Sequence, residues 1–296
     1  MGRLLFLPLA LALLGTSSAR AAEAAGDSPF TAEELIRKVA REQRRIDRGL
    51  TAATFDQLEV RTELDRNGLP KETRRRLFHY FSGDEPGSET RKLVEVDGRP
   101  ATEEEKSEAA RQDAKQRKKN EERRTAERVS RPPAVTGEEE DPLVGPRRLS
   151  DLVARYDYVL GGAVEEEGRL LYALEFRPKP GLRADSFGDR ALDALAGRVL
   201  VDAADFQVVA AEARLVAPLK VASGLAASVK SATVSYRARR LPGGTWFPCV
   251  VDLRLQGRRA LVFRFDTAFR FEFSGYASFS VETESEVGRP SVQSAP

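Results

Sequence analysis

Residues 259–273 read Arg-Ala-Leu-Val-Phe-Arg-Phe-Asp-Thr-Ala-Phe-Arg-Phe-Glu-Phe. Every second residue from Leu261 onward is apolar except Thr267, and most of these residues are phenylalanine. The residues between them are mostly charged: Arg264, Asp266, Arg270 and Glu272. A β-strand points alternate side chains to opposite faces. The stretch therefore predicts a long strand with an aromatic face and a charged face, in a curved antiparallel sheet.

The segment before this strand has the same alternation. Residues 247–255 place apolar side chains at every second position, which predicts a neighbouring strand, and residues 256–258 (Gln-Gly-Arg) predict the turn between the two. The apolar surface must be covered. Helices can cover it as part of a packed core, or an incomplete barrel can leave room for an acyl chain. On the second interpretation the lining residues are Phe247, Val251, Leu253, Leu255, Leu261, Phe263, Phe265, Phe269, Phe271 and Phe273.

Short turns separate the other predicted strands. Asn67-Gly68, a strong hairpin signal, joins a strand at residues 51–65 to one at 71–81, and Asp97-Gly98 follows a third at 91–96. The first of these alternates two sets of residues: Leu58, Val60, Thr62 and Leu64 with Glu59, Arg61, Glu63 and Asp65. Further strands are expected at 156–164, 170–176, 198–202, 206–216 and 232–239. Gly275 is expected to end the long aromatic strand, with a last strand at 276–282.

Helices are expected at four places. Residues 27–49 form the first, with capping-box spacing between Thr31 and Glu34. Its apolar stripe is Leu35, Val39, Ile46 and Leu50. This helix should dock on the sheet, with an exposed surface helix as the alternative. Two short helices are predicted at 149–154 and 189–196.

The fourth helix, at residues 102–129, is polar all round, because its apolar members are mainly alanines. Asp113 can pair with Arg117 along it. Such a helix projects into solvent, so it reads as a solvated spacer or, alternatively, as a docking arm for a partner protein at 102–128. Residues 130–146 are rich in proline and acidic residues and predict a disordered linker.

Consecutive strands with short connections give antiparallel meanders. The predicted fold class is α+β: about ten strands in a long antiparallel sheet, curved into a half-open β-barrel with capping helices and one charged helical insertion. The expected organisation is a signal peptide at 1–21, the first helix and strands at 22–101, the charged arm and linker at 102–146, the rest of the half-barrel at 147–284 and a loose tail at 285–296.

The N-terminus has the features of an export signal. Arg3 precedes an apolar run at residues 4–14, and Ala19-Arg20-Ala21 is a cleavage site. The apolar run is too short to span a membrane, so we expect a cleaved signal and a soluble periplasmic protein. Removing Arg3 and Arg20 leaves 46 basic residues against 46 acidic ones, so the charge does not indicate nucleic-acid binding.

The sequence offers no evident catalytic, metal or cofactor site. His79 is the only histidine and Cys249 the only cysteine, so they cannot complete a metal site together. His79 lies among aromatic residues in a predicted strand, and Cys249 on an apolar strand face, where a thiol is inert. Acidic pairs such as Asp202 and Glu212 cannot be placed against each other from sequence, so glycosidase chemistry is not singled out.

Several short motifs resemble the LolA/LolB-like lipoprotein-carrier superfamily, and also the sensor domain of RseB-type regulators. They are Gly197-Arg-Val-Leu-Val-Asp202, Phe206-Gln-Val-Val and Trp246-Phe-Pro248, within a similarity clearest over residues 149–283. The resemblance implies an unclosed antiparallel barrel capped by helices, with a hydrophobic cavity for acyl chains. The chain departs from the small carriers in its charged insertion at 102–146. The buried arginine latch of those carriers has no counterpart that we assign.

Together these patterns predict a periplasmic carrier or chaperone that holds the acyl chain of a lipid or lipoprotein, in lipoprotein trafficking to the outer membrane. The alternative is a non-enzymatic envelope interaction or regulatory protein with a fully packed sheet. An exported hydrolase is a more distant alternative.

Overall fold

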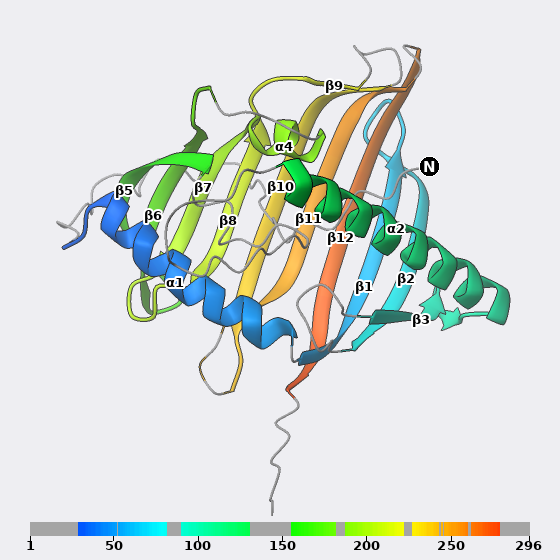
Figure 1. The fold of residues 1–296 in the computed structure, drawn as a ribbon, viewed down its shortest axis with the longest axis horizontal. Coiled ribbons are helices and arrows are strands. Elements are labelled where there is room, and N and C mark those ends of the chain that lie inside the picture. The colour runs from blue at the N-terminus through cyan, green and yellow to red at the C-terminus, as the bar shows by residue number, and fades with distance from the viewer. Residues whose placement is uncertain are drawn as a thin grey trace, which may run out of the picture.

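The computed structural model describes residues 29–51, 53–81, 90–130, 155–181, 187–221, 227–242, 244, 246–259 and 262–278. The predicted signal peptide, the linker at 131–146, the helix at 149–154 and the tail lie outside the described residues. One antiparallel sheet of 12 strands dominates the fold (Figure 1). Its order is β4-β3-β2-β1-β12-β11-β10-β8-β7-β6-β5, with β9 paired to β10. The sheet is not closed, because β4 and β5 lie at opposite edges. The predicted fold class is therefore confirmed.

The strands lie close to the positions that the sequence predicts. Their bounds are β1 Ala53–Leu64, β2 Pro70–Phe81, β3 Thr90–Val96, β4 Arg99–Pro100, β5 Tyr156–Glu166, β6 Arg169–Pro178, β7 Leu195–Asp202, β8 Val208–Leu215, β9 Leu219–Val221, β10 Ala227–Arg240, β11 Trp246–Arg259 and β12 Phe263–Ser278. The short strands β4 and β9 were not predicted. The predicted helix at 189–196 is α4, Phe187–Leu192. It ends early because Leu195 already begins β7.

Helix α1 (Ala32–Thr51) covers one half of the sheet. Its capping box is present: the Glu34 backbone N–H donates to Thr31 Oγ1 at 3.2 Å, and the Thr31 N–H donates to Glu34 Oε2 at 2.9 Å. Leu35, Val39 and Ile46 are buried, as the predicted stripe requires. Leu35 and Val39 pack against apolar residues of β5, β6, β7, β8 and β10, and we call this group the first core. Figure 1 shows α1 lying across these strands.

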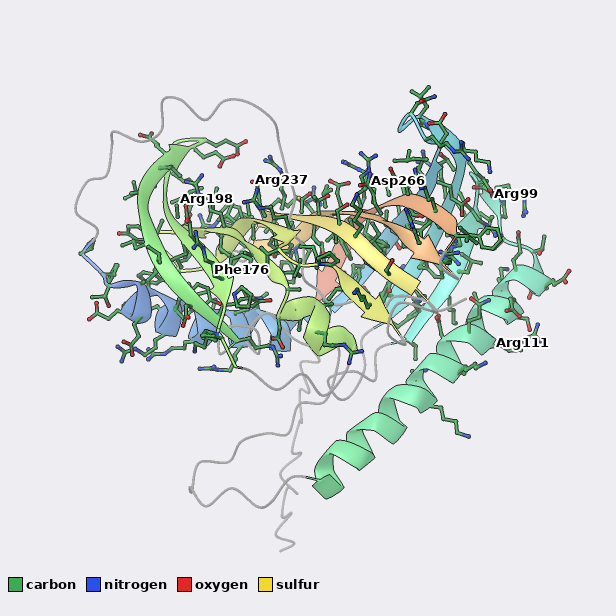
Figure 2. All side chains as sticks on the ribbon, turned by 90° about the horizontal axis from the view of Figure 1, so that it is seen from above. Arg99, Arg111, Phe176, Arg198, Arg237 and Asp266 are labelled. Atoms are coloured by element: carbon green, nitrogen blue, oxygen red, sulfur yellow. The ribbon has the colours of Figure 1, made fainter. Side chains whose placement is uncertain are left out.

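Helix α2 (Glu103–Ser130) lies on the same face of the sheet as α1, at the edge formed by β2 and β3. Only its first part packs against the strands. Ala109 is buried against Phe78, Leu93, Val96 and Ala101, which form a second core on β2 and β3. Asp113 accepts two hydrogen bonds from Arg91 of β3, both at 2.9 Å, instead of pairing with Arg117 along the helix as predicted. A bidentate pair with an oriented guanidinium is stronger than an exposed pair on the helix surface. Figure 2 shows the C-terminal half of α2 extending away from the sheet.

Two predictions around the aromatic strand are wrong. Residues 256–258 are not a turn, because β11 continues to Arg259, which pairs with Phe263 of β12. Gly257 instead allows close packing: a Cβ there would lie 2.0 Å from the Ser228 carbonyl oxygen and 2.7 Å from the Phe265 ring. Gly275 does not end the strand either. It adopts φ +64° beside Asp56 and β12 runs on to Ser278.

Candidate functional site

The apolar face that the sequence predicts is assembled by strands β11 and β12. Val251 lies opposite Phe271, Leu253 opposite Phe269, and Gly257 opposite Phe265. Directly opposed residues of an antiparallel pair share one face, so these apolar side chains line the same surface. We call this surface, with Leu255 and Phe273, the phenylalanine face.

The other face of the same strands carries the charged residues, as predicted. Arg254 donates to both carboxylate oxygens of Asp266, at 2.9 and 2.8 Å. This pair holds the pKa of Asp266 below its ordinary value, because the carboxylate accepts hydrogen bonds from Arg254. Figure 2 shows Asp266 and Arg237 on the side of the sheet away from α1 and α2, whereas Phe176 lies on the helix side.

The predicted lining residues differ in their exposure. Phe271 is buried, and most of the others are partly buried: Phe247, Val251, Leu253, Leu255, Phe265, Phe269 and Phe273. Phe263 is 69 % exposed, since it stands next to the β11–β12 connection, where its neighbour Val262 is exposed as well. Leu261 lies outside the described residues.

Aromatic residues that the sequence reading missed extend the phenylalanine face at one end. Phe55 of β1 stacks on Tyr80 of β2, with ring centroids 4.6 Å apart, and lies 6.0 Å from Phe273. Tyr276 lies 5.3 Å from Phe55 and 4.8 Å from Phe247. Its hydroxyl donates to the Pro248 carbonyl at 2.7 Å, and burial raises its pKa. The hydroxyl is therefore a neutral donor inside an aromatic cluster.

The phenylalanine face lies between the two cores. The first core ends at β10, with Leu253 of β11 as its outermost neighbour, and the second core occupies β2 and β3. Phe265, Phe269 and Phe273 belong to neither. In Figure 1 α1 crosses the strands of the first core, whereas α2 starts beside β3 and passes in front of β1, β12 and β11. Figure 2 shows that this later part of α2 stands away from the sheet.

Strand β1 brings polar side chains onto this apolar face. Gln57, Glu59 and Arg61 lie opposite Phe273, Phe271 and Phe269 of β12. Of the two alternating sets in β1, it is thus the polar set that shares the face with the phenylalanines. Phe55, Gln57 and Glu59 alternate along β1 just as the apolar set does. The sequence does not show that β1 pairs with β12, so it does not show which of the two sets shares a face with the phenylalanines.

The polar residues of β1 differ in their hydrogen bonding. Glu59 is buried and forms an ion pair with Arg76 of β2. Arg61 pairs with Glu63 at 2.5 Å, and its guanidinium carbon lies 6.0 Å from the centre of the Phe269 ring. Gln57 is 1 % exposed, and neither its amide oxygen nor its amide nitrogen has a hydrogen-bond partner among the described residues.

A cavity of about 260 Å³ lies beside these groups, between the first part of α2 and strands β2 and β3. Leu93, Val96 and Ala109 provide its apolar lining, and Arg76 reaches it from the ion pair with Glu59. Its remaining lining residues are polar or charged: Arg74, Glu104, Glu105, Glu108 and Gln112.

The residues considered for chemistry do not form a catalytic group among the described residues. His79 Nδ1 lies 2.6 Å from Asp56 Oδ1, and its ring packs on Phe81. The Cys249 thiol donates to the Arg237 carbonyl, and burial raises its pKa, which disfavours the reactive thiolate. In the described part of the chain, no cluster of three or more histidine, cysteine, aspartate and glutamate side chains could hold a metal ion.

The motif that begins at Gly197 has a structural role. A Cβ on Gly197 would lie 1.7 Å from the Glu212 carbonyl oxygen, so the glycine permits the close approach of β7 and β8. Asp202 is buried at the end of β7. Burial raises its pKa, but hydrogen bonds from Arg169 and from the backbone N–H groups of Ala204 and Asp205 outweigh this, and the net pKa is lowered. Glu212 lies opposite Arg198, four residues before Asp202 on β7, so Asp202 and Glu212 are not a facing acid pair.

A search of solved structures finds matches at low sequence identity, whereas no family model matches the chain and a search of curated proteins finds no relative. A DUF1329 family protein from Desulfovibrio piger is 13 % identical, with a TM-score of 0.38 over 88 % of this chain and 95 % of that one. A putative outer membrane lipoprotein-sorting protein domain from Vibrio parahaemolyticus is 11 % identical, with a TM-score of 0.36 over 86 % and 95 %.

The third structure belongs to the family that the sequence motifs resemble. It is a LolA superfamily protein from Nitrosomonas europaea, 11 % identical, with a TM-score of 0.30 over 85 % of this chain and 95 % of that one. A member of the superfamily that the sequence motifs resemble is thus among the matched structures. No helix in the described ranges combines the length and apolar character that crossing a membrane requires.

Proposed function

We propose that this protein binds an acyl chain on the phenylalanine face, as an exported carrier or chaperone for a lipid or lipoprotein. One observation carries the proposal. Phe265, Phe269 and Phe273 lie on the helix side of an open sheet, partly buried, and belong to neither of the two cores. A hydrocarbon chain is the ligand that best complements a surface without hydrogen-bonding groups at these positions.

The size of the surface suits a chain. From Phe273 to Phe265 the face extends about 26 Å along β12, at the usual rise of a strand. Burial of one methylene stabilises a complex by about 0.8 kcal/mol, so ten methylenes contribute about 8 kcal/mol before the costs of association. Release of such a ligand would need an acceptor with a more apolar site.

The strand itself supplies a matched pair of variants for the test. Phe269→Glu places a carboxylate at the centre of the phenylalanine face, whereas Phe263→Glu makes the same change at a position that is 69 % exposed. We expect Phe269→Glu to weaken binding of a fluorescent fatty acid at least tenfold and Phe263→Glu to leave it within twofold, because only the former buries a charge in the site.

Circular dichroism would establish that both variants fold. Native mass spectrometry of the purified mature protein, followed by lipid extraction, would then identify any co-purified ligand. Equal affinities of wild type, Phe269→Glu and Phe263→Glu would contradict the proposal, as would a clean apo mass together with no uptake of the fluorescent probe.

A second candidate function is docking of an envelope protein on α2. The observation that favours it is the exposed, charged surface of α2 beyond its anchor at Asp113, where Lys115, Arg117 and Lys118 are exposed. Figure 2 shows this part of the helix standing clear of the sheet. Replacing the three basic residues by glutamate should abolish pull-down of an acidic partner while fatty-acid uptake stays unchanged. A pull-down that is unaffected would remove this candidate.

A further inference from the structure

The side chain of Gln57 is the most unusual polar group on the phenylalanine face. It is 1 % exposed, and both atoms of its amide lack a hydrogen-bond partner among the described residues. Buried amides nearly always have hydrogen-bond partners in the protein, because burial removes their hydrogen bonds to water and leaving these unreplaced costs free energy. An unpaired amide at this depth therefore needs an explanation.

The neighbours of Gln57 explain why the protein itself does not satisfy it. Phe273 of β12 and Phe78 of β2 lie directly opposite it on either side, and neither ring offers a conventional hydrogen bond. The next polar group along the face is Glu59, whose carboxylate is already engaged by Arg76. The amide is thus enclosed by aromatic rings on both sides.

Stability does not account for a glutamine at this position. A leucine of similar volume would bury its side chain against the same rings without losing hydrogen bonds to water. Residues that cost stability concentrate where a protein binds or reacts. The amide also lies at the boundary between the aromatic cluster around Phe55 and the Glu59–Arg76 pair, where a ligand would change from apolar to polar.

We propose that Gln57 is a polar subsite that recognises an amide group attached to the hydrocarbon chain. Gln57 Oε1 accepts a hydrogen bond from the N–H of the ligand, a position where an ester presents only an oxygen lone pair. The carbonyl of a trans amide points the opposite way, so Gln57 Nε2 is left to donate to another oxygen of the polar end. An ester supplies only the acceptor, and a bare alkyl chain supplies neither. The inference rests on the proposed function, since it assigns the polar end of the same ligand.

Two isosteric probes test this pairing: N-methyldodecanamide, which has an N–H, and methyl dodecanoate, which has an ester oxygen in its place. Affinities are measured by displacement of a fluorescent fatty acid from the full mature chain. We expect wild type to bind the amide about fivefold to tenfold more tightly than the ester, and Gln57→Leu to bind both equally, because one hydrogen bond is worth about that factor.

Unfolding in urea provides a second measurement. Gln57→Leu should raise the midpoint, because it replaces an unpaired buried amide with an apolar group. Gln256→Leu is the control: Gln256 lies on the charged face of β11 and donates to Asp266 at 2.8 Å, so its loss should lower the midpoint and leave the amide preference intact.

The outcomes distinguish failure of the Gln57 subsite from failure of the acyl-chain site. Equal binding of both probes to wild type, or an amide preference that survives Gln57→Leu, overturns the subsite while the acyl-chain site stands. A lowered urea midpoint in Gln57→Leu also overturns it, since the amide is then satisfied within the protein. Failure of wild type to bind either probe overturns the acyl-chain site and the subsite with it.

The same amide chemistry occurs in an amide-linked lipid and in an N-acylated polypeptide. A further arm with N-dodecanoyl-tetraglycine amide distinguishes these sources. Affinity equal to that of the small amide supports the subsite with an acylated polypeptide as its ligand. Weaker binding, with the amide preference still present for the small probe, supports the subsite with a small lipid as its ligand.

Discussion

The two halves of the helix side of this sheet differ in how completely their side chains are buried and in the polar groups among them. On strands β5 to β8, aliphatic and aromatic side chains such as Val201 and Tyr172 pack around Leu174 beneath α1, and the members of this core are buried. On β11, β12 and β1, large phenylalanines stand beside Gln57 and the ion pair of Glu59, and most remain partly exposed. The first arrangement is that of a core packed for stability. The second leaves apolar area and polar groups in excess, as a binding surface does.

The largest expected difference between the halves is in the free energy of unfolding that is lost when a side chain is shortened to alanine. Leu174→Ala, at a position that is 0 % exposed, should lower the free energy of unfolding by about 3 kcal/mol, because it leaves a cavity under α1. Phe269→Ala removes more atoms but should cost only about 1 kcal/mol, because the ring is partly solvated and packs in neither core. Urea unfolding measures both. Equal costs would mean that the phenylalanine face is an ordinary core.

Substitutions at two glycines test the same difference between the halves, with a smaller expected effect. Gly197→Ala and Gly257→Ala each force a methyl group against a strand backbone, and each should cost about 1–3 kcal/mol in urea unfolding. Only Gly257→Ala also displaces the Phe265 ring, so only this variant should weaken fatty-acid uptake, by about threefold or more. Loss of uptake in Gly197→Ala, once folding is confirmed, would show that the two halves are not independent.

The smallest expected effect concerns the anchoring of α2 and its dependence on pH. Glu105 accepts hydrogen bonds from Arg99 and from the Thr102 backbone, and Arg99 chiefly lowers its pKa from 4.5 to about 2. The carboxylate therefore stabilises the folded state fully above about pH 4.5 and loses this effect as the pH falls toward 2. Glu105→Gln should lower the urea midpoint slightly at pH 7 and approach wild type near pH 2.

The neighbouring substitution Glu104→Gln provides the control. It removes the same charge one residue away and breaks no hydrogen bond to Arg99. It should leave the pH profile of the midpoint parallel to that of wild type. A difference between Glu105→Gln and wild type that stays constant from pH 7 to pH 3 would show that the hydrogen bonds of Glu105 do not depend on its charge.

The sequence predicts those parts of the fold that depend on local patterns. Alternation in residues 247–255 and 261–273 predicts the phenylalanine face, and the spacing of Thr31 and Glu34 predicts the start of α1, because both signals lie within a few residues. The turn predicted at residues 256–258 is wrong, because a glycine that lets a ring pack over a strand cannot be told in sequence from a glycine in a turn.

The polar part of the site is not predictable from such patterns. Gln57 meets Phe273 only because β1 pairs with β12, more than 200 residues later in the chain. Nothing in either strand alone specifies that partner or register, and a shift of one residue would turn Gln57 to the opposite face. Alternation shows that a strand has two faces, and only the assembled sheet decides which one is inside.

The pairing of β1 with β12 also has a consequence for how the protein is made. Strands β5 to β8 and α1 can assemble early, but the middle of the sheet stays open until the chain has been synthesised to Ser278. Closing so long a loop is slow, and β1 meanwhile keeps an unpaired edge, which is prone to wrong pairing. The phenylalanine face thus forms only when the two ends of the described chain have been brought together. A chain that ends before Ser278 therefore lacks the complete β1–β12 pairing on which this face depends.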